Sequence, residues 1–146
     1  MPWIFIALVW LMPAPAFAAE PLSVSPQPRQ QGYPWMPLGR WFAMHADDVA
    51  LAEAGESKLI FLGDSITEGW ETDGLEHWSR HFVPRGAVDF GISGDMTQHL
   101  LWRLENGAAG RLDPAAVVML IGVNNTGFTD EPPPVIARGI RANVDK

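Results

Sequence analysis

The fold of this chain is constrained most by short apolar runs, each of which ends in glycine and is followed by polar residues. Residues 58–62 and 115–121 form two such runs, and residues 88–90 form a weaker one. Continuous apolar runs of this length are typical of strands covered on both faces, so the two longer runs predict buried strands. Helix-forming segments lie between the runs. This alternation predicts an α/β fold with a parallel sheet and right-handed crossovers.

Three segments outside the strands predict helices. Residues 40–54 are good helix formers, and Gly55 supplies a C-terminal stop. Residues 96–105 predict a second helix, and the prolines at 132–134 open a third. The apolar positions of the last two helices recur at helical spacing: Leu100, Leu101, Leu104, Ile136, Ile140 and Val144.

Composition limits the class of protein. The 146 residues have room for one domain, and 47% hydrophobic with 18% charged residues describes a globular chain. A net charge of −7 argues against a nucleic-acid partner, because such binding needs clustered Lys and Arg. The sequence holds no Cys, which excludes disulfides and thiolate metal sites.

The N-terminal segment predicts export. Residues 1–18 are apolar and uncharged, but the run at 3–12 is shorter than the roughly 20 residues that span a bilayer. Small residues at 16 and 18 flank Phe17 in a cleavage pattern, so we expect a signal peptide at 1–18 and a periplasmic or secreted protein. No Lys or Arg precedes the apolar run, and a buried or membrane-retained N-terminus is the alternative. Residues 19–38 are expected to form a Pro-rich leader or linker that Trp35 and Trp41 anchor to a domain at 39–146.

The first polar motif, at residues 63–65, follows the first predicted strand. Ligands of open α/β sheets bind beyond the carboxyl ends of the strands, which is where Ser65 falls. At the start of a helix, free backbone N–H groups favour a developing oxyanion beside the Ser65 hydroxyl. Asp64 is expected to brace the turn. The alternative is a simple helix cap, since Asp and Ser are common caps.

The second and third motifs, at residues 91–95 and 122–125, follow the next two strands. Gly94 lets a main-chain N–H approach a ligand closely, although a tight turn explains a glycine equally well. Asn124 can donate two side-chain hydrogens, although Asn is also a frequent turn former. Hydrogen-bond donors at the ends of three consecutive strands together predict one ligand site in a shared crevice.

The motifs resemble those of the SGNH/GDSL family of serine ester hydrolases. The resemblance rests on residues 61–67, 89–99 and 121–125, and covers roughly residues 45–144. Residues 101–107 resemble the branch of the platelet-activating-factor acetylhydrolase catalytic subunits. The resemblance implies a flavodoxin-like three-layer sandwich that is incomplete here, with about three strands. It also implies cleavage of small acyl or acetyl esters on carbohydrate or lipid, without a metal or an organic cofactor.

The resemblance also implies the roles of individual residues. Ser65 would be the nucleophile. The backbone N–H groups of Ser65 and Gly94 and the side chain of Asn124 would form the oxyanion hole, with Asp64 and Asp95 in support. The family's Asp-x-x-His motif has no counterpart after Asn124. Impaired turnover is therefore expected. The four histidines are expected to be packing or surface residues, with His99 nearest the crevice: His45, His77, His81 and His99.

The sequence leaves two other function classes as alternatives. The first is a non-catalytic binding module, because a third strand with one unpaired apolar edge invites self-association or pairing with a complementing chain. The second is a nucleotide or phosphate binder, which ranks lower because neither Gly-x-x-x-x-Gly-Lys-Ser/Thr nor Gly-x-Gly-x-x-Gly occurs.

Overall fold

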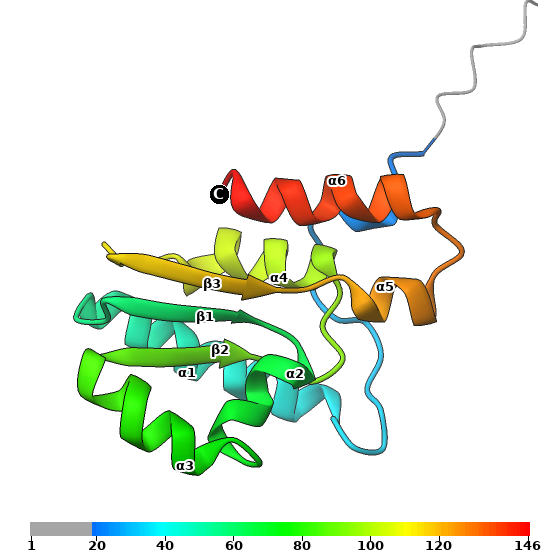
Figure 1. The fold of residues 1–146 in the computed structure, drawn as a ribbon. Coiled ribbons are helices and arrows are strands. Elements are labelled where there is room, and N and C mark those ends of the chain that lie inside the picture. Colours follow the sequence, from blue (N-terminus) through cyan, green and yellow to red (C-terminus); the bar gives the residue numbers. More distant parts are fainter. Residues whose placement is uncertain (1–18) are drawn as a thin grey trace, which may run out of the picture.

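A parallel three-stranded sheet forms the centre of the molecule (Figure 1). The computed structural model describes residues 19–146, and the predicted signal peptide at 1–18 lies outside the described residues. The strands are β1 (Leu59–Gly63), β2 (Ala87–Gly91) and β3 (Ala116–Leu120), arranged in the order β2-β1-β3. The expected parallel α/β fold is therefore confirmed, with strand ends within about one residue of those predicted.

Helices cover both faces of the sheet (Figure 1). The helix α1 ends at Gly55, whose φ of 69° is left-handed, as a C-terminal stop requires. Of the helices formed by residues 19–146, none is long and apolar enough to cross a membrane. The α-helices are α1 (Leu38–Ala54), α2 (Ser65–Glu68), α3 (Leu75–His77), α4 (Thr97–Arg103), α5 (Val123–Phe128) and α6 (Pro133–Val144).

The two faces of the sheet have different cores. On one face, side chains of β1 and β2 pack with α1 and α4 in a buried apolar cluster that includes Ile60, Leu62, Phe90, Leu100 and Ala52. On the other face Phe61 meets aromatic rings from the β1–β2 crossover. Its ring centroid lies 5.1 Å from that of Trp78 and 6.3 Å from that of Trp70. Helix, sheet and helix thus form three layers.

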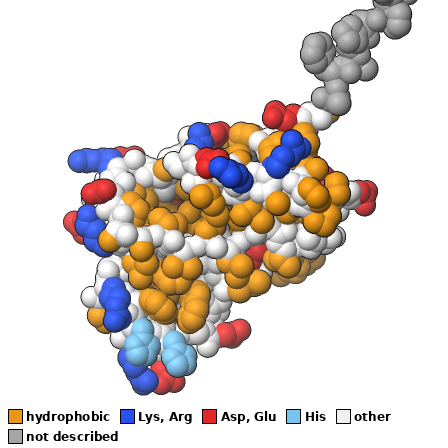
Figure 2. Space-filling view, turned by 45° about the horizontal axis from the view of Figure 1, so that its top comes forward, with side chains coloured by type: hydrophobic (Ala, Val, Ile, Leu, Met, Phe, Trp, Pro, Cys, Tyr) orange, Lys and Arg blue, Asp and Glu red, His pale blue; other side chains and the backbone are white. Residues whose placement is uncertain are grey.

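The strand β3 is not buried as its sequence predicts. The side chains of Val117, Val118 and Leu120 are 50%, 46% and 53% exposed. The position of β3 explains this exposure. Among residues 19–146, β1 is the one strand hydrogen-bonded to β3, and a parallel strand is buried only where other elements cover it. Hydrophobic side chains gather over the middle of the face seen in Figure 2. Val144 of α6, expected on an apolar face, is likewise 67% exposed.

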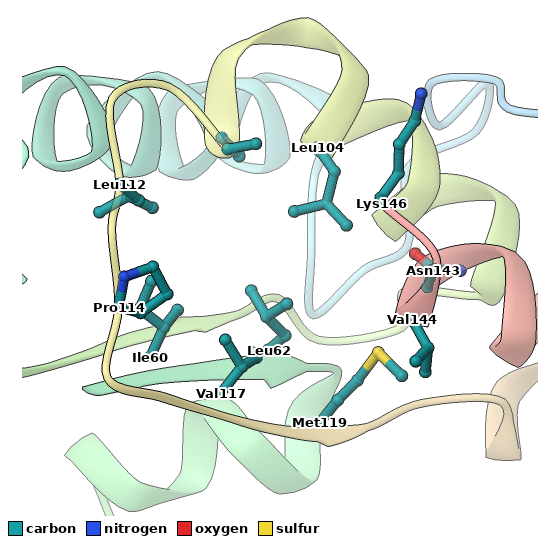
Figure 3. A pocket seen from close by; sticks show the side chains of 12 residues that line it. Ile60, Leu62, Leu104, Leu112, Pro114, Val117, Met119, Asn143, Val144 and Lys146 are labelled. Carbon is teal, nitrogen blue, oxygen red and sulfur yellow. The ribbon is translucent and has the colours of Figure 1, made fainter. Parts of the chain in front are cut away.

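A pocket of about 320 Å³ opens beside β3. Side chains of β1, β3, the turn after α4 and the end of α6 line it (Figure 3). Its walls are mostly apolar, and Asn143 and Lys146 contribute polar groups. The lining includes none of Ser65, Gly94 and Asn124. This pocket is therefore separate from the three motifs.

The segment 19–38, expected as an extended leader, packs along the domain. Ser23 is fully buried, and its carbonyl accepts a 2.8 Å hydrogen bond from the Thr97 hydroxyl. Trp41, an expected anchor, is also fully buried, whereas the other expected anchor, Trp35, is 52% exposed. The segment therefore forms a wall of the domain near the start of α4.

Candidate active site

Ser65 is the first residue of α2, directly after β1, and its side chain is exposed. The turn depends on Gly63, because a Cβ there would collide with the Thr67 hydroxyl and lie 2.5 Å from the Leu120 carbonyl oxygen. Asp64 is fully buried and caps the helix by accepting a 3.0 Å hydrogen bond from the Ile66 N–H. The cap role thus falls to Asp64, and Ser65 faces solvent.

The second motif is hydrogen-bonded to α2. The carboxylate of Glu68, in α2, accepts a 2.7 Å hydrogen bond from the Ser93 N–H. A Cβ at Gly91 would collide with the Glu68 backbone nitrogen, so glycine permits this approach. Gly94 has a φ of 79°, in the left-handed region that favours glycine. The sequence did not single out Glu68, because its hydrogen-bond partner Ser93 lies 25 residues later in another motif.

The third motif is hydrogen-bonded to the second. The side-chain amide of Asn124 donates a 2.8 Å hydrogen bond to the Asp95 carbonyl. The neighbouring Asn125 accepts one of 2.9 Å from the Thr97 N–H. An Asn amide has two hydrogens, so this arrangement orients the Asn124 side chain and leaves one hydrogen for a ligand. The structure therefore brings the three predicted motifs to one edge of the sheet.

The Asp95 carboxylate is fully buried beneath the second motif. It accepts hydrogen bonds of 2.6 Å from the Trp41 indole and 3.1 Å from the Arg29 guanidinium. Its other oxygen lies 2.8 Å from Nε of Arg103, in an ion pair. Burial raises the pKa of Asp95, and the charge of Arg103 and the Trp41 hydrogen bond act in the opposite direction. This carboxylate is thus a structural support for the second motif.

Arg103 links that support to the strands. It is fully buried, and its Nη1 donates a 2.7 Å hydrogen bond to Asp48 of α1. Its Nη2 donates to the carbonyls of Phe90 at 2.9 Å and Gly63 at 3.4 Å. Burial raises the pKa of Asp48 to about 7, and Arg103 opposes that shift. One guanidinium therefore holds the carboxyl ends of β1 and β2.

Two of the four histidines are buried in the packing of the domain, and two are exposed at the surface. His99 is buried, and its Nδ1 accepts a 3.2 Å hydrogen bond from the Met96 N–H. Burial, with two nearby guanidinium groups, lowers the pKa of His99 to about 3, so the ring is neutral at pH 7. Burial also lowers the pKa of His45, whereas His77 and His81 are exposed. In residues 19–146 no group of three His, Cys, Asp or Glu side chains is placed to hold a metal ion.

Comparison with known proteins identifies the class. Residues 61–146 match the GDSL-like Lipase/Acylhydrolase family, and the chain belongs to this family. It is 42% identical over 106 residues to platelet-activating factor acetylhydrolase IB subunit alpha1 of Bos taurus, covering 73% of this chain and 44% of that protein. It is 36% identical over 107 residues to the IB subunit beta homolog of Drosophila melanogaster, covering 73% of this chain and 45% of that protein.

A solved structure is also similar. It is described as a platelet activating factor from Streptococcus pneumonia and matches with a TM-score of 0.54 and 26% identity, over 71% of this chain and 46% of that one. The resemblance to GDSL hydrolases and to platelet-activating-factor acetylhydrolase subunits is thus confirmed, as is the α/β fold with an incomplete sheet. The chain spans less than half the length of the curated relatives it matches.

Proposed function

We propose that this chain carries the nucleophile and the oxyanion hole of a serine ester hydrolase. Ser65 is the nucleophile, and the donors are the backbone N–H groups of Ser65 and Gly94 and the side chain of Asn124. The observation that carries the proposal is an exposed serine at the start of a helix that is linked to both other motifs. Glu68 of the same helix, α2, accepts a hydrogen bond from the second motif, and the second motif accepts one from Asn124. The substrates are small acyl esters, including acetyl esters of carbohydrate or lipid alcohols.

The chemistry follows from these groups. The Ser65 oxygen attacks the acyl carbon, and the carbonyl oxygen gains negative charge that the three donors stabilise. The bond to the alcohol then breaks, and water later releases the acyl group from Ser65. His99 does not take the Ser65 proton, because its Nδ1 is engaged by the Met96 N–H. Water takes this proton and returns one to the leaving alcohol. Oxyanion stabilisation and binding alone leave a rate of roughly 10³–10⁴ over water, so we expect slow turnover.

The test is hydrolysis of p-nitrophenyl acetate by the full chain beside two variants. Ser65→Ala should remove the protein-dependent rate and the acetyl adduct that mass spectrometry detects on the peptide containing Ser65. Ser79→Ala, which changes an exposed serine of the β1–β2 crossover, should behave like the parent. Equal rates for the parent and Ser65→Ala would reject Ser65 as the nucleophile.

A second candidate is a non-catalytic interaction module that self-associates through β3. It is favoured by the half-exposed Val117, Val118 and Leu120, which lie on a strand with one edge that no strand of the described part of the chain pairs with. Identical edges can pair across a twofold axis, so the partner we propose is a second copy of the chain. Size-exclusion chromatography with light scattering distinguishes the cases: a monomer at every concentration contradicts self-association.

We also propose a periplasmic or secreted location, on the strength of the sequence of residues 1–18. Expression of the full chain in a bacterium, followed by N-terminal sequencing of the exported protein, should give a mature start at Ala19. Retention of the chain with Met1 intact would contradict the proposal.

A further inference from the structure

The second motif contains a tight turn at residues 92–95. A 3.0 Å hydrogen bond from the Asp95 N–H to the Ile92 carbonyl joins its ends, and Gly94 has a φ of 79°. Among residues 19–146 only glycines have a positive φ, so the residue before Gly94 does not. A positive φ at the third position alone defines a type II turn. Ser93 and Gly94 are therefore the two central residues of this turn, and one peptide unit joins them.

The hydrogen bond that closes the turn leaves the orientation of this central peptide unit open. Turns of types I and II share that hydrogen bond and differ by about half a rotation of the central peptide unit. Glycine permits both forms, because it adopts a φ of either sign. No peptide bond in residues 19–146 is cis, and in a trans unit the C=O and the N–H point in opposite directions. A group that orients the Ser93 carbonyl therefore also orients the Gly94 N–H.

The two ends of this peptide unit differ in their partners. Gly94 is buried, and its N–H has no hydrogen-bond partner within the described part of the chain. Buried backbone N–H groups are nearly always paired, so an unpaired one in a candidate site indicates a place for a ligand. The Ser93 carbonyl, in contrast, accepts a 2.7 Å hydrogen bond from Nη2 of Arg29. The structure thus occupies the carbonyl and leaves the N–H available.

The Arg29 side chain is itself held in place. It is buried, and the same Nη2 donates a 3.1 Å hydrogen bond to the Asp95 carboxylate. Its guanidinium lies 5.4 Å from the Tyr33 ring centroid and 5.8 Å from that of Trp41, within the range of cation–π attraction. A carboxylate and two rings therefore fix this guanidinium on the carbonyl side of the peptide unit.

We propose that Arg29 is a positioning residue that holds the Gly94 N–H in the orientation needed for an oxyanion. Its hydrogen bond selects the type II form of the turn and directs the Gly94 N–H away from the guanidinium, into the crevice. It also polarises the peptide unit, because linked hydrogen bonds strengthen one another. The inference rests on the proposed function for the oxyanion that this donor stabilises. The segment 19–38, which lies outside the matched residues 61–146, thereby contributes to the reaction.

The first test is NMR of the isotope-labelled full chain without substrate. A hydrogen bond to a carbonyl moves the resonances of its carbon and of the following amide nitrogen downfield. Arg29→Met removes the donor but keeps a long side chain, so the Ser93 carbon and the Gly94 nitrogen should both move upfield. Arg29→Lys should recover part of the shift, because Arg29 makes both hydrogen bonds from one nitrogen. In the parent, a Ser93 carbon shift typical of an unbonded carbonyl would contradict the inference without any variant.

The second test measures the reaction, as the rate at which p-nitrophenyl acetate acetylates the peptide containing Ser65. Arg29→Met should lower the rate at saturating ester about 10²-fold, close to the loss of one oxyanion donor. The half-saturating ester concentration should not change, because the oxyanion exists only in the transition state and the intermediate that follows it. Arg29→Lys should recover part of the rate.

Two controls separate this role from general support of the motif. Trp41→Phe removes a hydrogen bond to the Asp95 carboxylate and none to the Ser93 carbonyl, so it should retain most of the rate. Arg80→Met, at an exposed arginine of the β1–β2 crossover, should match the parent. Circular dichroism should show all variants folded.

The outcomes distinguish the inference from the proposed function. Equal rates and equal shifts in the parent and Arg29→Met would overturn the inference. So would a loss of rate in Trp41→Phe as large as that in Arg29→Met, since support of Asp95 would then explain both. An absence of acetylated Ser65 in the parent, together with shifts that depend on Arg29, would reject the proposed catalysis alone.

Discussion

At the scale of single residues, the site depends on a glycine that holds no reactive group. Gly63 lies where β1, α2 and the end of β3 meet, and a side chain there would collide with Thr67 and with the Leu120 carbonyl. We predict that Gly63→Ala lowers the free energy of unfolding by about 1–3 kcal/mol, as overpacking does. Urea denaturation of the parent and the variant measures this difference in the free energy of unfolding.

Gly39 provides the matched control. It lies in α1, and a Cβ there would meet no atom within 4 Å. Gly39→Ala should raise stability by about 0.4–1 kcal/mol, because alanine reduces the conformational freedom of the unfolded chain. Equal effects at both glycines would show that close approach at Gly63 does not matter.

Asp89 should make stability depend on pH. Burial raises its pKa to about 7 from an ordinary value of 3.8, although the Gly91 N–H hydrogen bond opposes the shift. The folded state therefore holds the proton more tightly than the unfolded chain. The stability that protonated Asp89 contributes is fully present below pH about 4 and is lost as pH rises through 7.

Asp89→Asn should therefore flatten the fall in stability between pH 4 and pH 7. Thermal or urea unfolding across this range measures the slope. Asp48 has a pKa shift of the same direction and remains, so part of the slope should persist. Asp73→Asn, at an exposed position, should match the parent slope. A slope in Asp89→Asn identical to that of the parent would contradict the prediction.

The sequence predicted that the three motifs lie at the carboxyl ends of the strands, with Asp64 and Asp95 in support, but it did not single out Glu68 and Arg103. Ser65, Gly94 and Asn124 stand in short local patterns, so their meeting at one edge followed from the parallel sheet. Glu68 and Arg103 act through partners far along the chain, and no local pattern reveals those partners. One signal for Arg103 existed, because it interrupts the apolar helix positions at 100–104.

At the scale of elements, apolar runs that end in glycine predicted the strands closely. The prediction that β3 is buried was wrong, because an apolar run does not reveal whether another strand or helix covers it. The packing of segment 19–38 had no periodic signal either. Its place is set by individual hydrogen bonds, such as that from the Thr97 hydroxyl to the Ser23 carbonyl.

Arg103 connects α1, α4 and the ends of two strands, so its loss should affect all of them. Arg103→Ala leaves the buried Asp48 without its guanidinium partner and removes one of the two guanidinium groups that face the buried Asp95. We predict a destabilisation of about 3–5 kcal/mol, the cost of breaking a buried ion pair. Chemical denaturation measures it, with Arg80→Ala as control because the Arg80–Glu76 pair is exposed. Similar losses in both variants would contradict this role.

At the scale of the whole molecule, the distribution of burial is uneven. The apolar core on one side of β1 is buried, whereas the outer strand leaves apolar side chains in contact with solvent. An uncovered apolar edge tends to associate. The behaviour of the protein in solution should therefore depend on β3 more than on any other strand.

A charge on β3 should block association. Val118→Lys places a cation on a strand position that is 46% exposed, and lysine is a common means of protecting sheet edges. Sedimentation velocity should find this variant monomeric at concentrations where the parent forms dimers. Val83→Lys, at a position 52% exposed in the β1–β2 crossover, should leave association unchanged. Dimers of equal strength in Val118→Lys would exclude β3 as the interface.

The integration of segment 19–38 has a consequence for folding kinetics. Ser23 is hydrogen-bonded to Glu131, which is 108 residues later in the chain, and Arg29 pairs with Asp95 across 66 residues. Contacts between such distant positions form slowly, because the intervening polypeptide must first be ordered. The earliest described residues to leave the ribosome are thus among the last to find their partners.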